Sequence, residues 1–326
     1  MSTSSTATAA RHTAPWRGLL GQEALLLAAL LLLVAVVGAI NPRFLAERNL
    51  ETIFLGNAYV AVAAIGMSMV IISGNIDVSV GSLIGVLATL SGSLAVAGAP
   101  IALSWTLPIL AGMAATAFMG FLVAYLNIPS IVVTLGMLSI LKGGLIMVTG
   151  GAWISNLPPG YHLAQGELLG APVPIWFMVV LTALAAWWMR HSAFGRSIYA
   201  VGGNAEAARL AGISRRRTVL LVFTIHGAFA GIAAVLFATQ LSVIQSTVPP
   251  ALELTIITAS VVGGVSILGG LGSVVGSTLA AILLAAIASS LIFVNVSPYW
   301  IRAVQGVLIL ATVLADLWRR RRQERR

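Results

Sequence analysis

The chain has 326 residues, of which 59% are hydrophobic and 8% charged, and its mean hydropathy is +1.01. Soluble domains carry roughly 25% charged residues, so this composition excludes a soluble protein and indicates an integral membrane protein. The chain has no cysteine, which excludes disulfides and cysteine-ligated metals. Its net charge is +9, but the arginines lie between apolar runs and at the C-terminus. That distribution favours positive-inside membrane topology over a nucleic-acid partner.

Ten apolar runs are long enough to cross a bilayer, which takes about 20 mostly apolar residues. They lie at 21–40, 53–73, 76–97, 105–126, 130–149, 173–189, 219–241, 251–268, 272–294 and 300–317. A sheet is disfavoured, because an open sheet edge in lipid leaves backbone groups unpaired. The expected fold is therefore an all-α, polytopic membrane protein with one transmembrane domain over residues 21–317.

Short polar tails flank this domain. Residues 1–20 carry Arg11 and Arg17 before the first apolar run, which is typical of a signal sequence. Because many spans follow, we expect an uncleaved signal-anchor helix. The basic tail 318–326 is expected to be disordered or to lie at the lipid headgroups.

The Lys and Arg residues predict the orientation. Ten spans place both termini on one side, and cytoplasmic loops are enriched in Lys and Arg. The side that includes the termini holds fourteen arginines and the other side three, with Lys142 inside a span. The fourteen are Arg11, Arg17, Arg190, Arg196, Arg209, Arg215, Arg216, Arg217, Arg319, Arg320, Arg321, Arg322, Arg325 and Arg326, and the three are Arg43, Arg48 and Arg302. Both termini are therefore expected in the cytoplasm.

Two connections are long and polar. Residues 150–172 form an outer loop rich in Gly and Pro, and 190–218 form the longest cytoplasmic loop. Within the second, Ala205–Ala211 predicts a short helix with Asn204 as N-cap and Gly212 as its C-terminal stop. A simple connector does not need such a helix, although a solvated helix without a partner is the alternative.

A polar segment interrupts the apolar sequence at 74–81. Asp77 lies there between two spans, where an ionised carboxylate must face water, protein or a helix N-terminus. Asp77 or Ser79 is expected to cap the helix that begins near Val80, and the alternative is a role lining the translocation path. The flanking glycines indicate a broken or re-entrant segment. Together with a second glycine-rich break near 263–272, the candidate pathway or helix-break residues are Asn75, Asp77, Ser79, Gly81, Gly264 and Gly270.

Other polar residues receive simpler interpretations. Lys142 and Glu253 are expected near span ends, where they snorkel to the interface or face a hydrophilic cavity. His226 is expected one turn into a span as a packing histidine rather than a proton relay. Small-residue spacings at Gly81-x-x-x-Gly85, Gly227-x-x-x-Gly231 and Gly272-x-x-x-Gly276 predict close helix packing. There is no Walker A pattern and no catalytic constellation, so we expect a transport subunit that binds no cofactor of its own.

Four segments resemble ribose-type ABC transporter permeases: 73–82, 134–144, 195–213 and 263–273. This resemblance implies a dimer of permease chains that forms the pore, a cytoplasmic ABC ATPase that uses the ATP, and a periplasmic or lipid-anchored sugar-binding protein. It also implies that the helix near Ala205–Ala211 contacts the ATPase. The ATPase-coupling residues would be Gly195, Arg196, Gly202, Gly203, Asn204, Glu206, Ala207, Arg209 and Gly212. Ser73, Asn75 and Lys142 depart from the residues usual in the family.

The sequence therefore predicts the permease subunit of an importer for a sugar or sugar-like solute in the bacterial inner membrane. Three alternatives remain open at this point. They are a permease of the related branched-chain amino-acid importers, an ion-coupled secondary transporter and a membrane-embedded enzyme.

Overall fold

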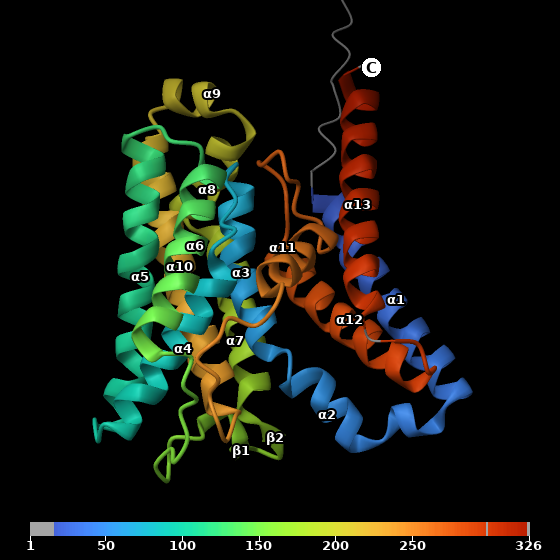
Figure 1. Cartoon of the computed structure of the whole chain (residues 1–326). Coiled ribbons are helices and arrows are strands. Elements are labelled where there is room, and N and C mark those ends of the chain that lie inside the picture. Colours follow the sequence, from blue (N-terminus) through green and yellow to red (C-terminus); the bar gives the residue numbers. More distant parts are fainter. Residues whose placement is uncertain (1–15, 298, 325–326) are drawn as a thin grey trace, which may run out of the picture.

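The computed structural model of the chain describes residues 16–297 and 299–324 and is a bundle of helices (Figure 1). Eight described helical segments are long and apolar enough to cross a membrane. The expected all-α polytopic fold is therefore confirmed. In chain order the elements are α1 (Trp16–Ile40), η1 (Pro42–Leu45), α2 (Glu47–Leu55), α3 (Ala58–Ile72), α4 (Val80–Val96), α5 (Ile101–Tyr125), α6 (Ser130–Thr149), η2 (Leu163–Gln165), β1 (Glu167–Leu168), β2 (Ala171–Pro172), α7 (Val173–His191), α8 (Ala193–Gly203), α9 (Ala205–Leu210), α10 (Arg215–Thr239), α11 (Leu252–Val262), α12 (Val274–Phe293) and α13 (Trp300–Glu324).

Two of the ten expected spans are shorter than predicted. α4 has 17 residues and α11 has 11, which correspond to about 26 Å and 17 Å of helix, against a hydrocarbon thickness of about 30 Å. The expected spans 76–97 and 251–268 are therefore only partly helical. In each case the chain runs through non-helical backbone before the helix begins.

The buried centre of the bundle is formed mainly by α3 and α10. Every residue of α3 except Tyr59 is buried. α10 packs closely against α5, because a Cβ on Gly227 or Gly231 would collide with the α5 backbone at Gly112 or Ile109. The small-residue spacing at Gly227 and Gly231 thus brings two helix backbones together, as predicted.

The peripheral helices expose apolar side chains. Only 17% of the best apolar window of α1 is buried, and the corresponding values for α6 and α13 are 11% and 6%. An exposed apolar surface on a span is the surface that lipid covers. The predicted span 53–73 is also modified, since the helix breaks at Gly56 and Asn57 between α2 and α3.

The ends of the bundle differ. In Figure 1 the start of α1, the end of α13 and α9 lie at one end, and β1 and β2 lie at the other. We call these the α9 end and the hairpin end. The predicted tails are partly helical, because α1 begins at Trp16 and α13 continues to Glu324. Residues 1–15 and 325–326 of those tails lie outside the described residues.

The expected outer loop 150–172 folds against the hairpin end. It contains η2 and the antiparallel pair β1–β2, in which Leu168 pairs with Ala171. Tyr161 is fully buried, and its hydroxyl donates a 2.8 Å hydrogen bond to Ser91 Oγ. The backbone N–H of Ala164 donates to Thr239 Oγ1 at the end of α10. The loop is therefore an ordered cover over α4 and α10.

Candidate functional site

A polar break separates α3 from α4. α3 ends in a Schellman motif, in which the N–H of Gly74 donates to Ile71 O and that of Asn75 donates to Val70 O. Gly74 has φ +83°, which L residues with a Cβ rarely adopt. The Asn75 side chain is 7% exposed and donates to the Ser73 carbonyl and hydroxyl oxygens. After this turn the chain re-enters the bundle, as predicted for a broken segment.

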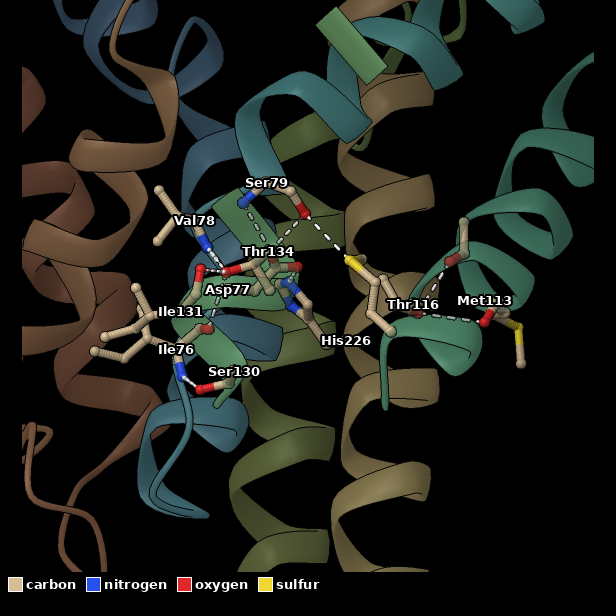
Figure 2. Close-up of polar contacts among 12 residues, drawn as sticks. Ile76, Asp77, Val78, Ser79, Met113, Thr116, Ser130, Ile131, Thr134 and His226 are labelled. Atoms are coloured by element: carbon tan, nitrogen blue, oxygen red, sulfur yellow. Dashed lines mark hydrogen bonds and ion pairs between the residues drawn. The ribbon is translucent and has the colours of Figure 1, made fainter. Parts of the chain in front are cut away.

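The re-entering backbone finds its hydrogen-bond partners on α6 (Figure 2). The N–H of Ile76 donates to Ser130 Oγ at 3.2 Å, and the N–H of Val78 donates to Thr134 Oγ1 at 3.1 Å. Non-helical backbone at membrane depth is tolerated only where protein satisfies its polar groups. Ser130 and Thr134 are four residues apart and therefore share one helix face. Sequence reasoning missed them, although that spacing was visible.

Asp77 lies at the centre of this break and is fully buried. Its Oδ1 accepts hydrogen bonds from the N–H of Ser79 at 2.7 Å and from the Ser79 hydroxyl at 2.6 Å. Its Oδ2 lies 3.1 Å from Nε2 of His226. This contact between two buried side chains joins the break to α10. Sequence reasoning did not pair these two residues, which are 149 positions apart.

His226 fixes the depth of the break. It is the twelfth of the 25 residues of α10, so it lies at the middle of that span. The prediction that it lies one turn into a span is wrong, because α10 begins four residues earlier than expected, at Arg215. Its assignment as a buried, hydrogen-bonded side chain is confirmed. Asp77 therefore lies beside the middle of α10.

The prediction that Asp77 or Ser79 caps α4 is correct for the position of Ser79, but the expected side-chain hydrogen bond to the helix is not formed. Ser79 is the N-cap residue of α4, but its side chain makes no capping bond to the helix. Asp77 instead accepts a hydrogen bond from the backbone N–H of Ser79, the residue just before the helix. Asp77 and Ser79 are each 0% exposed. Within this chain their contacts are those of helix-break residues, and the pathway role stays a prediction.

The glycines of α4 accommodate the non-helical segment that precedes α11 and the first turn of α11 itself. A Cβ on Gly92 would strike Ile244, one on Gly85 would lie 3.3 Å from Val248, and one on Gly81 would lie 2.8 Å from the backbone nitrogen of Glu253. The segment before α11 thus runs along α4 in the opposite direction. Close packing at Gly81 and Gly85 was predicted; Gly81 packs on the first turn of α11, whereas Gly85 packs on non-helical backbone.

This arrangement corrects the predicted depth of the intramembrane charges. Glu253 is in the first turn of α11 and packs on Gly81. Gly81 follows Asp77 by only four residues, so Glu253 lies near the polar break inside the bundle. Lys142 is the thirteenth of the 20 residues of α6. Both were expected near span ends. The error for Glu253 arose because α11 is a half-length helix that begins inside the bundle.

A second break follows α11. The helix ends in a Schellman motif at Gly264, whose N–H donates to Val261 O, while the N–H of Val265 donates to Ser260 O. Gly264 is thus a C-terminal cap residue. On the same loop, the N–H of Gly270 donates a 2.8 Å hydrogen bond to the carbonyl oxygen of Ile72 at the end of α3. The two breaks are therefore joined backbone to backbone.

The end of α8 completes this contact. A Cβ on Gly202 would coincide with the Ile72 carbonyl oxygen and lie 2.8 Å from the nitrogen of Gly270, and a Cβ on Gly269 would lie 2.8 Å from Gly202 O and 2.9 Å from Gly74 Cα. We call Gly74, Gly202, Gly203, Gly269 and Gly270 the glycine junction. At Gly202, Gly269 and Gly270 the backbones approach so closely that no side chain fits between them.

Tyr199 of α8 strengthens the same junction. Its hydroxyl donates a 3.1 Å hydrogen bond to the carbonyl oxygen of Gly272. Burial raises the pKa of Tyr199 to about 12, so the phenol remains a donor at physiological pH. α8 is thereby fixed to the loop that leads into α12.

The expected loop 190–218 is more helical than predicted, because α8 was not foreseen. Ser192 caps α8 by accepting the N–H of Gly195 at 2.8 Å. Gly195 packs against the backbone of Met189, and Arg196 donates to the carbonyl oxygen of His191 at 3.0 Å. Gly195 and Arg196 therefore shape the α7–α8 turn.

The predicted short helix is confirmed as α9. The Asn204 side chain accepts the N–H groups of Glu206 and Ala207, as an N-cap does. At the other end Gly212 has φ +82° and its N–H donates to Arg209 O, which completes a Schellman motif. Cap and stop are thus the residues predicted.

The surface of α9 combines an ion pair with one large exposed apolar side chain. Glu206 and Arg209 form an ion pair of 2.6 Å, and the hydrogen bond from Arg209 holds the pKa of Glu206 below its usual value. Ala207 is exposed, and Leu210 is 76% exposed. A leucine so exposed on a capped helix outside the spans is a candidate for contact with a partner. Among the described residues, no three His, Asp or Glu side chains gather as metal ligands would.

The chain was compared with known proteins. Residues 49–313 match the model of a family described as the permease component of the branched-chain amino acid transport system. The chain is 36% identical over 296 residues to the autoinducer 2 import system permease protein LsrC of Salmonella typhi, covering 90% of this chain and 85% of that protein. LsrC of Escherichia coli O157:H7 is also 36% identical, covering 90% and 86%. No solved structure matches the chain.

Proposed function

The chain belongs to the permease family whose model matches residues 49–313, and from that premise we propose that it moves autoinducer 2 or a related sugar-like solute through the membrane. The relatives that are 36% identical carry the name of autoinducer 2 import permeases, which supports this solute class over branched-chain amino acids. The chain is a multi-pass transport subunit of an ABC importer, and its partners supply ATP hydrolysis and solute capture.

The finer arrangement is also proposed. Two permease chains form the pore, lipid surrounds them, an ABC ATPase lies at the α9 end, and a sugar-binding protein docks at the hairpin end. Both termini then lie in the cytoplasm of a bacterium and the transmembrane domain in its inner membrane. Two observations support this orientation: α9, the start of α1 and the end of α13 lie at one end of the bundle (Figure 1), and the arginines concentrate on that side.

The observation that carries the proposal is the link from α9 to the polar break. α9 is capped at both ends, follows α8 directly, and α8 meets the end of α3 at the glycine junction. Closely packed backbones do not deform continuously. A movement of α9 on an ATPase is therefore transmitted to Gly74 and the break beside Asp77, provided that the two ATPase states contact α9 differently.

Leu210→Asp tests this coupling. We expect the variant to insert and fold, because Leu210 is exposed, but to lose at least tenfold in ATP-driven uptake in proteoliposomes that contain the complete importer. Glu206→Lys should act similarly. Ala193→Asp is the matched control, since it adds the same charge to an exposed position at the start of α8 and should transport normally.

ATPase binding and uptake are measured on the same preparations. Normal uptake by Leu210→Asp and Glu206→Lys would refute the assignment of α9. Solute identity is tested separately by competition of autoinducer 2, ribose and leucine for uptake. Uptake of leucine alone would favour the branched-chain amino-acid alternative.

A further inference from the structure

A cavity lies where α3, α11, α12 and α13 meet. It has two adjoining parts of about 230 and 260 Å³, which share the lining residues Pro250, Thr255, Ile301 and Gln305. A water molecule occupies about 30 Å³ in the liquid, so the cavity has room for a small solute. The starts of α3, α11 and α13 line it. Because α13 ends at the α9 end (Figure 1), the start of α13 and the cavity lie toward the hairpin end.

Neutral polar side chains reach this cavity among apolar ones. They are Asn57 and Tyr59 at the start of α3, Thr255 of α11 and Gln305 of α13. Gln305 is only 8% exposed, and its Nε2 donates a 3.1 Å hydrogen bond to Thr255 Oγ1. Within residues 16–297 and 299–324, Oε1 of Gln305 and the hydroxyl of Tyr59 have no hydrogen-bond partner. Polar groups without partners are unfavourable against lipid chains, so the cavity suits a polar occupant.

The wall at the start of α11 is held in a fixed conformation. Pro249 and Pro250 line the cavity, and Ala251 after them has φ +60°. Such a conformation of a residue with a Cβ persists only where the surroundings hold it, and it is enriched at ligand sites. α4 supports this wall, because a Cβ on Gly81 would lie 3.3 Å from Leu252 Cβ, and Leu252 lines the cavity too. The cavity is therefore preformed and adjoins the polar break.

The charge of the lining restricts what the cavity can hold. The first part is lined by uncharged residues, and the second adds one exposed cation, Arg302. A buried zwitterion such as an amino acid needs charged partners for both of its ends. A neutral solute with several hydroxyls needs only hydrogen bonds, which amide and hydroxyl side chains donate and accept. Mostly apolar walls with a few polar groups are typical of small-molecule sites.

We propose that this cavity binds an uncharged, hydroxyl-rich solute during transport, and that Gln305 and Tyr59 form hydrogen bonds to it. This inference rests on the proposed transport function and adds the place where the chain contacts its solute. The neutral lining then disfavours amino acids, which agrees with a sugar-like cargo.

Because the chain has no cysteine, a single introduced cysteine can report on the cavity. Ala288→Cys, in the lining, is reacted with a small neutral methanethiosulfonate reagent in nucleotide-free proteoliposomes that contain the complete importer. We expect ribose or autoinducer 2 to slow the reaction about tenfold at about ten times its Kd, since only the empty cavity reacts. Leucine should not slow it. Adding Gln305→Leu should remove this protection, and Gln245→Leu, the same change at an exposed position outside the cavity, should retain it.

Ser242→Cys, at an exposed position in the loop between α10 and α11, is the control and should react without protection by any solute. If Ala288→Cys stays unreactive, lipid or a second permease copy fills the cavity and the proposal is overturned. Reaction without protection, or equal protection by leucine, also overturns it. Tyr59→Phe should weaken the protection and serves as the second variant if Gln305→Leu does not fold. ATP-driven uptake by the cysteine-free parent is measured separately, so failure of the transport function is distinguished from failure of the cavity.

Discussion

Replacing Gly202 by alanine tests the glycine junction at one atom. The new Cβ would coincide with the carbonyl oxygen of Ile72, which accepts the 2.8 Å hydrogen bond from the N–H of Gly270. Overpacking of this kind costs about 1–3 kcal/mol, and an unsatisfied buried backbone group costs about 1–3 kcal/mol more. The better helix propensity of alanine returns about 1 kcal/mol or less. We therefore expect a net loss of about 1–5 kcal/mol.

Gly203→Ala is the matched control. The two glycines are neighbours in α8, yet a Cβ on Gly203 would have its nearest contact at 3.9 Å, with Gly270 Cα. We expect this variant to range from neutral to about 1 kcal/mol more stable. The folded fraction and the midpoint of denaturant unfolding are measured for both variants in detergent. Equal stability of the two variants would refute the close approach of α3, α8 and the 263–273 loop.

Two further changes test the polar break and its attachment to α8. Asp77→Ala removes the acceptor for the N–H of Ser79 and leaves His226 without its partner, so the folded yield should fall severalfold with the solute profile unchanged; an altered profile at normal yield would instead indicate a pathway role. Tyr199 has a folded-state pKa of about 12 against a usual 10. Its contribution to stability is therefore complete below pH 10 and disappears as pH rises through 12. Tyr199→Phe should show a smaller loss of stability over that interval in alkaline unfolding, and an unchanged loss would contradict the burial of its hydroxyl.

Local signals were sufficient for several features because they act over a few residues. Membrane location follows from composition, since too few polar residues exist to cover a soluble surface. The caps of α9 follow from two residues. The side chain of Asn204 determines where the helix starts, and the backbone freedom of Gly212 determines where it stops. The break at Gly74 likewise follows from glycine and an isolated acid in an apolar run.

Long-range partners could not be read in the same way. The contact between Asp77 and His226 joins residues 149 positions apart, and the contact among Gly202, Ile72 and Gly270 joins three separate segments. Nothing in the local sequence specifies such pairs. The position of Glu253 was misjudged for the same reason. The segment before α11 packs inside the bundle because the glycines of α4 leave room for its backbone and side chains.

The amino-acid sequence alone therefore determined that the chain lies in a membrane, where its helices begin and end near caps, and which short segment leaves the spans. Hydrophobicity and backbone preference depend on residues that are close together in the chain, so they can be predicted from the sequence. Only the tertiary structure decided which polar groups meet inside the bundle and which glycines bring backbones together. Those contacts depend on how whole helices pack, and packing is a property of the complete bundle.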